Sequence, residues 1–178
     1  MNHQESKLQQ QCATCFRAEH REYASLLTHP INEGGANTRV SGAIHKAEGT
    51  VAGVPDFLLF LPAEYDRMYF GLGIELKTPL GRQSQQQKDF QLMFQAAGYH
   101  YIVIRSLDEF RMHVNDWLNH VPDHIKEAVA SAYRQLADDA LQRQREKLQR
   151  IITHKKPPLP ARQRRAIIDP IKQDSYEK

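Results

Sequence analysis

The sequence is poor in cysteine and has no long apolar run, and both features narrow the possible classes of protein. Two cysteines among 178 residues cannot build a disulfide framework. Cys12 and Cys15 form a lone C-x-x-C in a segment of helical periodicity, which fits either two small buried residues or a redox or metal-binding pair. No apolar run approaches the ~20 residues of a membrane helix, and the polar N-terminus does not resemble a secretory signal. We therefore expect no membrane partner and a cytoplasmic location.

The chain also has little net charge, but that charge is unevenly placed. The formal net charge is +3 and the isoelectric point is about 8.9, which permits binding to nucleic acid without establishing it. Residues 143–165 hold nine lysines and arginines and a single acid, Glu146. A block of like charge at a chain end is typical of an interaction tail. The other interpretation is a solvated, disordered end, and we expect residues 153–178 to be disordered in either case.

Hydrophobic periodicity predicts an α/β domain. An apolar run between Pro55 and Pro62 is typical of a buried strand, and we expect the next strand to pair back on it as a hairpin. A helix capped by Ser84 then leads to a third strand, which favours a parallel crossover. The segment 32–53 is predicted to be a long loop. The predicted elements are a helix at 4–21, strands at 56–61 and 69–76, a helix at 84–97, a strand at 99–104, and helices at 107–118 and 122–150.

Charged side chains stand at the ends of two predicted strands that are otherwise apolar. Asp56 opens the first strand, while Glu75 and Lys77 lie two apart near the end of the second and so share a face. Hairpin pairing would bring Asp56 close to Glu75, and oxygen ligands of this kind suit Mg²⁺ or Mn²⁺. A metal of this kind activates water and polarises a phosphodiester, and Lys77 could orient the water or stabilise developing charge. Gln87, in the next helix, could point back at Lys77.

Three motifs in order give the sequence a specific resemblance. They are G-T-V-A-G-V-P-D at 49–56, I-E-L-K at 74–77 and G-R-Q-S-Q-Q-Q at 81–87, followed by A-G-Y at 97–99 before an apolar strand. Together they resemble the VRR-NUC domain, a branch of the PD-(D/E)XK nuclease superfamily, over about residues 4–120. The resemblance implies a restriction-endonuclease-like core, with a central mixed β-sheet flanked by helices and an added C-terminal helix. We divide the chain into a nuclease-like domain at 1–120, an amphipathic helix at 121–152 and a basic tail at 153–178.

The resemblance also implies roles for individual residues. Asp56, Glu75 and the main-chain carbonyl of Leu76 would bind the metal, Lys77 would handle the nucleophilic water, and Gln87 would support the site. An acidic residue of the first helix often completes the site in this family. Glu5 matches that pattern better than Glu19, although a solvated charge at a helix start is the other interpretation of Glu5.

Basic residues outside these motifs are candidate contacts to nucleic acid. Arg39 and Lys46 precede the Gly-x-Pro-Asp motif and could bind phosphates, which positions a duplex without reading its sequence. The tail residues Arg162, Arg164 and Arg165 could add salt-sensitive affinity. Plain exposure to solvent is the alternative for each. The apolar stripe of the helix at 122–150 could pack on the core or on a second subunit.

The predicted function is metal-dependent hydrolysis of DNA phosphodiester bonds. Small stand-alone relatives resemble phage or phage-derived enzymes, which places the protein in a bacterial or phage-infected cytoplasm. The resemblance further suggests homodimers that cut branched DNA such as four-way junctions. One rival is a nucleic-acid-binding module that has lost cleavage. Another is an assembly protein that dimerises through its C-terminal helix.

Overall fold

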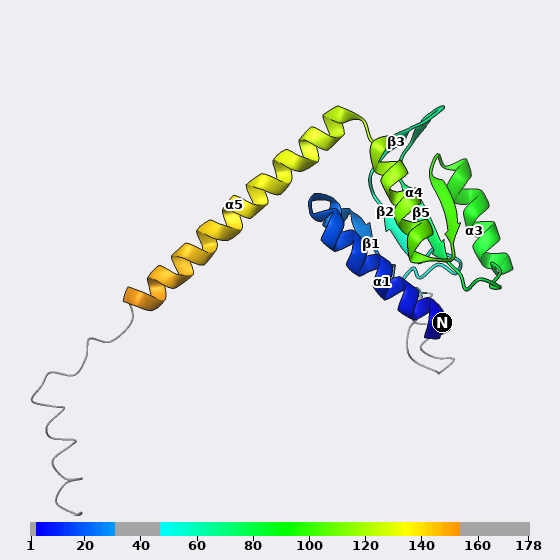
Figure 1. The fold of residues 1–178 in the computed structure, drawn as a ribbon, viewed down its shortest axis with the longest axis horizontal. Helices are drawn as coiled ribbons and strands as arrows, with labels where there is room; N and C mark the ends of the chain where they lie inside the picture. The colour runs from blue at the N-terminus through cyan, green and yellow to red at the C-terminus, as the bar shows by residue number, and fades with distance from the viewer. Residues whose placement is uncertain (1–2, 31–46, 154–178) are drawn as a thin grey trace, which may run out of the picture. The chain divides into compact units, whose positions relative to one another are not determined.

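The computed structural model describes residues 3–30 and 47–153, and Figure 1 shows the arrangement of their helices and strands. In chain order the elements are α1 (His3–Glu19), the 3₁₀ helix η1 (Arg21–Leu26), β1 (Leu27–Thr28), β2 (Phe57–Leu59), β3 (Ala63–Glu64), β4 (Met68–Tyr69), β5 (Leu72–Leu76), α3 (Gln85–Ala96), β6 (His100–Ile104), α4 (Leu107–Asn119) and α5 (Asp123–Thr153). None of the helices in this described part of the chain has the length and apolarity needed to cross a membrane.

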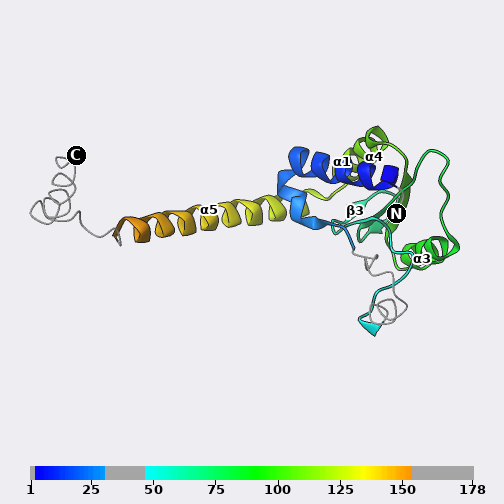
Figure 2. The same ribbon diagram turned by 90° about the horizontal axis from the view of Figure 1, so that it is seen from below.

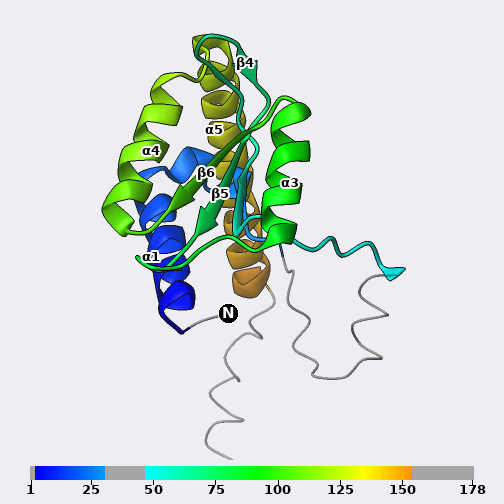
Figure 3. The ribbon, with the colours of Figure 1, turned by 90° about the vertical axis from the view of Figure 1, so that its right-hand side faces the viewer.

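A four-stranded mixed sheet in the order β1-β2-β5-β6 forms the centre of the domain. Neighbouring strands are antiparallel from β1 to β5, and β5 pairs with β6 in parallel across the connecting helix α3. Figures 2 and 3 show α1 and α4 on one face of this sheet and α3 on the other. The predicted mixed sheet, its flanking helices and the parallel crossover are therefore confirmed.

The core lies between the sheet and the helices α1 and α4. It includes Phe16 of α1, Ile74 of β5 and Trp117 of α4, each with an exposed fraction of 1% or less. Cys12 and Cys15 are both free and buried on α1, and burial raises the pKa of the Cys12 thiol to about 12. Both cysteines therefore fit the first interpretation, two small buried residues, because a protonated thiol is a poor nucleophile and metal ligand.

The predicted strand at 69–76 is wrong in one respect, because it divides at Gly71. A side chain at Gly71 would lie 2.7 Å from the main-chain oxygen of Leu59, so the backbones approach too closely there for any other residue. The first part, β4, pairs with β3 in a separate two-stranded sheet. Only β5 pairs with β2, with Leu59 opposite Leu72. The expected antiparallel pairing is thus present, but the two strands are not joined by a simple turn.

The long helix α5 begins near the predicted residue, and residues near its start pack against the core. Ile125 and Val129 are half-buried against the core, whereas Leu136 and Leu141 are 61% and 47% exposed. The first part of the predicted stripe therefore packs on the core. The chain forms two compact units, Met1–Tyr133 and Arg134–Lys178, and α5 passes from the first into the second.

Candidate active site

The two predicted carboxylates lie side by side at the edge where β2 and β5 pair. Phe57 is opposite Ile74, so the register brings the preceding Asp56 next to Glu75, as the hairpin pattern predicted. The main-chain amide of Leu76 donates a hydrogen bond of 2.7 Å to Asp56 Oδ2. That bond holds the Asp56 carboxylate against the main chain of β5, the strand that carries Glu75.

Glu75 and Lys77 form a buried ion pair on the α3 side of the sheet. Lys77 Nζ lies 2.6 Å from Glu75 Oε1, and the two residues are only 8% and 1% exposed. Glu75 accepts a further hydrogen bond of 3.2 Å from the hydroxyl of Tyr101. Burying a charge is costly unless it is paired and hydrogen-bonded, and these contacts supply both conditions.

Gln87 contacts the site through the start of helix α3. Ser84 is the N-cap: its hydroxyl accepts from the amide of Gln87, and the Gln87 side-chain oxygen accepts from the amide of Ser84. This reciprocal capping box leaves Gln87 Nε2 free to donate to Glu75 Oε1 at 2.5 Å. The expectation that Gln87 points at Lys77 is therefore corrected, because its amide group contacts Glu75 instead.

The site places two carboxyl groups beside one lysine, and both carboxyl groups resist ionisation. Burial raises the pKa of Glu75 to about 7; neighbouring Asp56 also raises it, while Lys77 and Tyr101 act in the opposite direction. Burial likewise raises the pKa of Asp56, against the lowering effect of the Leu76 amide and Lys77. A buried and a half-buried carboxyl group that both resist ionisation beside a single ammonium form an environment that favours a further cation.

Helix α1 brings an acidic residue to the same edge of the sheet. Glu5 Oε1 accepts a hydrogen bond of 3.2 Å from the main-chain amide of Thr78, directly after Lys77. The charge of Glu5 is also close enough to raise the pKa of Asp56. Glu19, near the other end of α1, forms an ion pair of 2.8 Å with Arg111 instead. Glu5 rather than Glu19 is thus the acidic residue that α1 presents to the site.

Tyr101, His29 and Arg105 lie near the site and were not predicted from the sequence. Tyr101 supports Glu75, and His29 Nδ1 lies 2.8 Å from the main-chain oxygen of Asp56. The side-chain nitrogen of Gln9 lies 2.7 Å from the same imidazole nitrogen, which connects α1 to the strand that carries Asp56. The third is Arg105, which follows β6 beside the end of β5. Only Arg105 had a local signal, as a charge that ends an apolar strand.

An open cavity is lined by Lys77 and by residues near the start of α1. Its volume is about 310 Å³. It is lined by Gln4, Glu5, Leu8, Lys77, Thr78, Pro79 and Arg105. The cavity therefore lies between residues near the start of α1, the segment that follows β5, and Arg105.

The donor set fits a hard cation with few protein ligands. Among residues 3–30 and 47–153, no three His, Cys, Asp or Glu side chains cluster tightly enough to hold a metal by themselves. Mg²⁺ commonly takes only one or two carboxylates and keeps several waters. Asp56 and Glu75, with the adjacent carbonyl of Leu76, are compatible with that pattern. Glu5 accepts a hydrogen bond from the Thr78 amide beside these groups, and its role as a metal ligand stays a prediction.

The remaining predicted contacts lie outside the described residues. These are Arg39 and Lys46, before the Gly-x-Pro-Asp motif, and the tail residues Arg162, Arg164 and Arg165. The predicted loop at 32–53 is described only from residue 47 onward.

This fold and this edge of the sheet define an α/β domain of nuclease type. The family model of the VRR-NUC domain matches residues 1–108, so the chain belongs to the VRR-NUC family, whose members are nuclease-type proteins. A solved structure named VRR_NUC domain protein is similar in fold, with a TM-score of 0.57 and 18% sequence identity, covering 68% of this chain and 93% of that one. No curated protein matches the sequence. The match ends shortly after the start of α4, so α5 lies beyond it.

Proposed function

We propose that this protein is a metal-dependent nuclease that hydrolyses DNA phosphodiester bonds. The observation that carries the proposal is the buried Glu75–Lys77 pair next to Asp56, at the edge of the sheet in a VRR-NUC domain. A structural ion pair would need no second carboxylate beside it. Asp56 adds a charge whose ionisation is disfavoured there, which makes sense if a cation completes the site.

We propose a separate role for each residue of the site. Asp56 and Glu75, with the carbonyl of Leu76, would hold Mg²⁺ or Mn²⁺, which when bound would lower the pKa of a water and polarise the phosphate. Gln87 and Tyr101 hold the Glu75 carboxylate in one orientation. Lys77 places a positive charge where a water and a phosphate oxygen would meet, and so offsets the charge that develops on the phosphate.

A cleavage assay with matched variants tests the proposal. Wild type should cut labelled DNA with Mg²⁺ or Mn²⁺ and leave it intact in EDTA. Asp56→Asn and Lys77→Ala should each lose roughly 100-fold or more of the activity while still binding DNA. Asp139→Asn, an exposed carboxylate of α5, should cut like wild type. DNA left intact by wild type under every metal, with equal binding by all variants, would instead identify a binding module that has lost cleavage.

The substrate and the oligomeric state rest on the family resemblance. We propose that the protein acts as a homodimer on branched DNA, because two sites related by a two-fold axis could cut two strands symmetrically. Linear, nicked, flap and four-way-junction DNA should be compared in one assay, with the mass of the protein in solution measured by light scattering. Equal cutting of linear and junction DNA would remove the branched-DNA proposal and leave the nuclease proposal intact. Dimers with no affinity for DNA would point to an assembly protein.

The basic residues outside the described segments complete the proposal. Arg39 and Lys46 would contact phosphates near the site, and Arg162, Arg164 and Arg165 would add affinity that depends on salt.

A further inference from the structure

A second cavity lies on the opposite face of the sheet from the candidate active site. Leu72 of β5 is opposite His100 of β6, and both alternate with the residues that face α3. Glu75 contacts Tyr101 on that other face, so the sheet separates the two places. The cavity has a volume of about 200 Å³, less than the roughly 300–1,000 Å³ of pockets for drug-sized ligands. It is lined by Tyr65, Asp66, Tyr69, Leu72, His100, Ile102, His113, Asp116 and Trp117.

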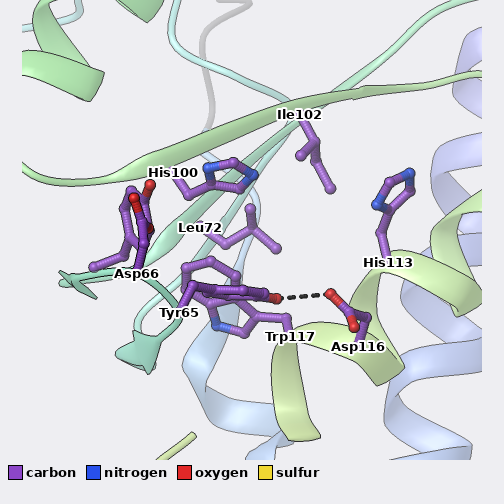
Figure 4. Close-up of a pocket in the computed structure, with 9 residues that line it drawn as sticks. Tyr65, Asp66, Leu72, His100, Ile102, His113, Asp116 and Trp117 are labelled. Atoms are coloured by element: carbon purple, nitrogen blue, oxygen red, sulfur yellow. Dashed lines mark hydrogen bonds between the residues drawn. The ribbon is translucent and has the colours of Figure 1, made fainter. Parts of the chain in front are cut away.

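Flat aromatic rings make up most of the wall. Figure 4 shows His100 on one side of the cavity and Tyr65 with Trp117 on the other, with Leu72 between them. The rings of His100 and Trp117 are nearly parallel, with an interplanar angle of 16° and centroids 5.8 Å apart. Tyr69 meets the edge of His100 at 5.2 Å. Trp117 and Leu72 are each only 1% exposed, which gives the cavity a rigid apolar floor.

The polar groups of the cavity are chiefly acceptors of hydrogen bonds. Asp66 and Asp116 are exposed carboxylates, and none of the described residues that line the cavity is a lysine or arginine, although Arg67 lies next to it. The hydroxyl of Tyr65 donates to Asp116 Oδ2 at 2.8 Å, which orients that carboxylate toward the rings. Burial, then His113 and Arg67, lower the pKa of His100, so this imidazole is neutral near pH 7. Within residues 3–30 and 47–153, the imidazole rings of His100 and His113 make no hydrogen bond, although the main-chain amide of His100 donates to the carbonyl of Gly71.

We propose that this cavity binds a guanidinium group, presented by an arginine side chain of a partner protein or by a small free guanidine. A guanidinium is flat, stacks on aromatic rings and donates up to five hydrogen bonds to carboxylates and imidazoles. The protein already shows this contact next to the cavity, where the guanidinium of Arg67 lies 4.7 Å from the centre of the Tyr69 ring. Two carboxylates at the opening would repel a phosphate, so DNA is not the expected occupant.

The floor of the cavity provides its own probe. Trp117 is the single tryptophan of the chain, so its fluorescence reports on this cavity alone. Titration with agmatine should change the emission with a dissociation constant on the order of 1 mM, because one head group makes few contacts. Carbamoylputrescine, which has an uncharged urea group in place of the guanidinium of agmatine, should bind at least about tenfold more weakly. Equal binding of the two, or tighter binding of adenosine than of agmatine, would overturn the proposal.

Variants at the opening test the role of the carboxylate. Asp116→Asn should weaken agmatine binding about tenfold, and Tyr65→Phe should weaken it less, by removing the bond that orients Asp116. Asp108→Asn, an exposed carboxylate of the same helix α4 that does not line the cavity, should bind like wild type. Unchanged binding by Asp116→Asn with an unchanged melting temperature would refute the assignment.

Titration with a peptide distinguishes a guanidinium of a protein segment from a small free guanidine. A short acetylated peptide amide with one arginine should bind like agmatine if a free guanidine is the ligand, and more tightly if a protein segment is. The same peptide with citrulline in place of arginine is the matched control. Indistinguishable affinities of these two peptides would again contradict a site for guanidinium.

Discussion

At the scale of single residues, Glu75 is a carboxyl group buried where ionisation is unfavourable. Its carboxylate is 1% exposed and receives donors from Lys77, Gln87 and Tyr101. Even so, burial raises its pKa to about 7. A native state that holds a proton more tightly than the unfolded chain gains stability at low pH and loses that gain as the pH rises.

The free energy of unfolding of the metal-free protein should therefore depend on pH through the ionisation of Glu75. The contribution is fully present below the ordinary pKa of 4.5 and is lost as the pH rises through about 7. Between these values it should lower the free energy of unfolding by about 1 kcal/mol for each pH unit. Urea unfolding in EDTA at several pH values measures the slope, and Glu75→Gln should flatten it.

The exposed Glu64 is the matched control for this experiment. Glu64→Gln should leave the slope as it is in wild type. If Glu75→Gln and wild type gave parallel pH profiles, the raised pKa of Glu75 would be contradicted.

The same residue scale shows what the sequence could and could not predict about the site. Asp56, Glu75 and Lys77 were predictable because the alternation of a strand and one antiparallel pairing are enough to place them together. His29 and Tyr101 were not, because each reaches the site through pairing between strands far apart in the chain. Their sequence neighbourhoods are those of ordinary strand ends, so no local pattern distinguishes them.

At the scale of elements, length decided how much the sequence could predict. The helices α1, α3, α4 and α5 lie close to their predicted positions, because each is long enough to show a periodic apolar face. The strands β1, β3 and β4 have two residues each, which is too few for any alternation. The second sheet and the break at Gly71 depend on contacts between backbones, and a sequence pattern does not contain them.

Two glycines before Asp56 offer a test of how the preceding loop is positioned against α3. Gly53 and Gly49 both have positive φ, +86° and +93°. A side chain at Gly53 would lie 2.3 Å from the main-chain oxygen of Gln86, whereas one at Gly49 would meet nothing within 4 Å. Gly49→Ala should therefore cost only backbone strain, about 1 kcal/mol, and Gly53→Ala about 3 kcal/mol.

Urea unfolding measures the two costs, and cleavage rates show their effect on the site. Gly53→Ala should also reduce cleavage, because the residue at 53 precedes Asp56 and touches the helix that carries Gln87. Equal losses of stability in the two variants would mean that the contact with Gln86 contributes nothing.

At the scale of the whole molecule, the basic C-terminal segment lies outside the family match. The VRR-NUC match ends at residue 108, while the basic block begins at Arg143. The site and the sheet are complete without that block. The tail is therefore expected to change how strongly nucleic acid binds and not whether it is cut.

Truncation after Arg150 should flatten the salt dependence of DNA binding. Each phosphate contact that is lost should reduce the slope of log affinity against log salt by about 0.9 for duplex DNA. Cleavage at low salt and saturating protein should be unchanged. A full-length variant with glutamine in place of Lys155, Lys156, Arg162, Arg164 and Arg165 separates loss of charge from loss of chain. An unchanged slope would mean that the tail makes no contact with phosphates.

The alternation along β5 links correct folding to correct chemistry. Leu72, Ile74 and Leu76 build the core on one face, while Glu75 and Lys77 project from the other. A slip of one residue in strand pairing would turn the ion pair into the core and the leucines toward α3. Such a molecule would lose its apolar core. The register that buries the leucines is therefore also the register that places Glu75 beside Lys77 and Asp56.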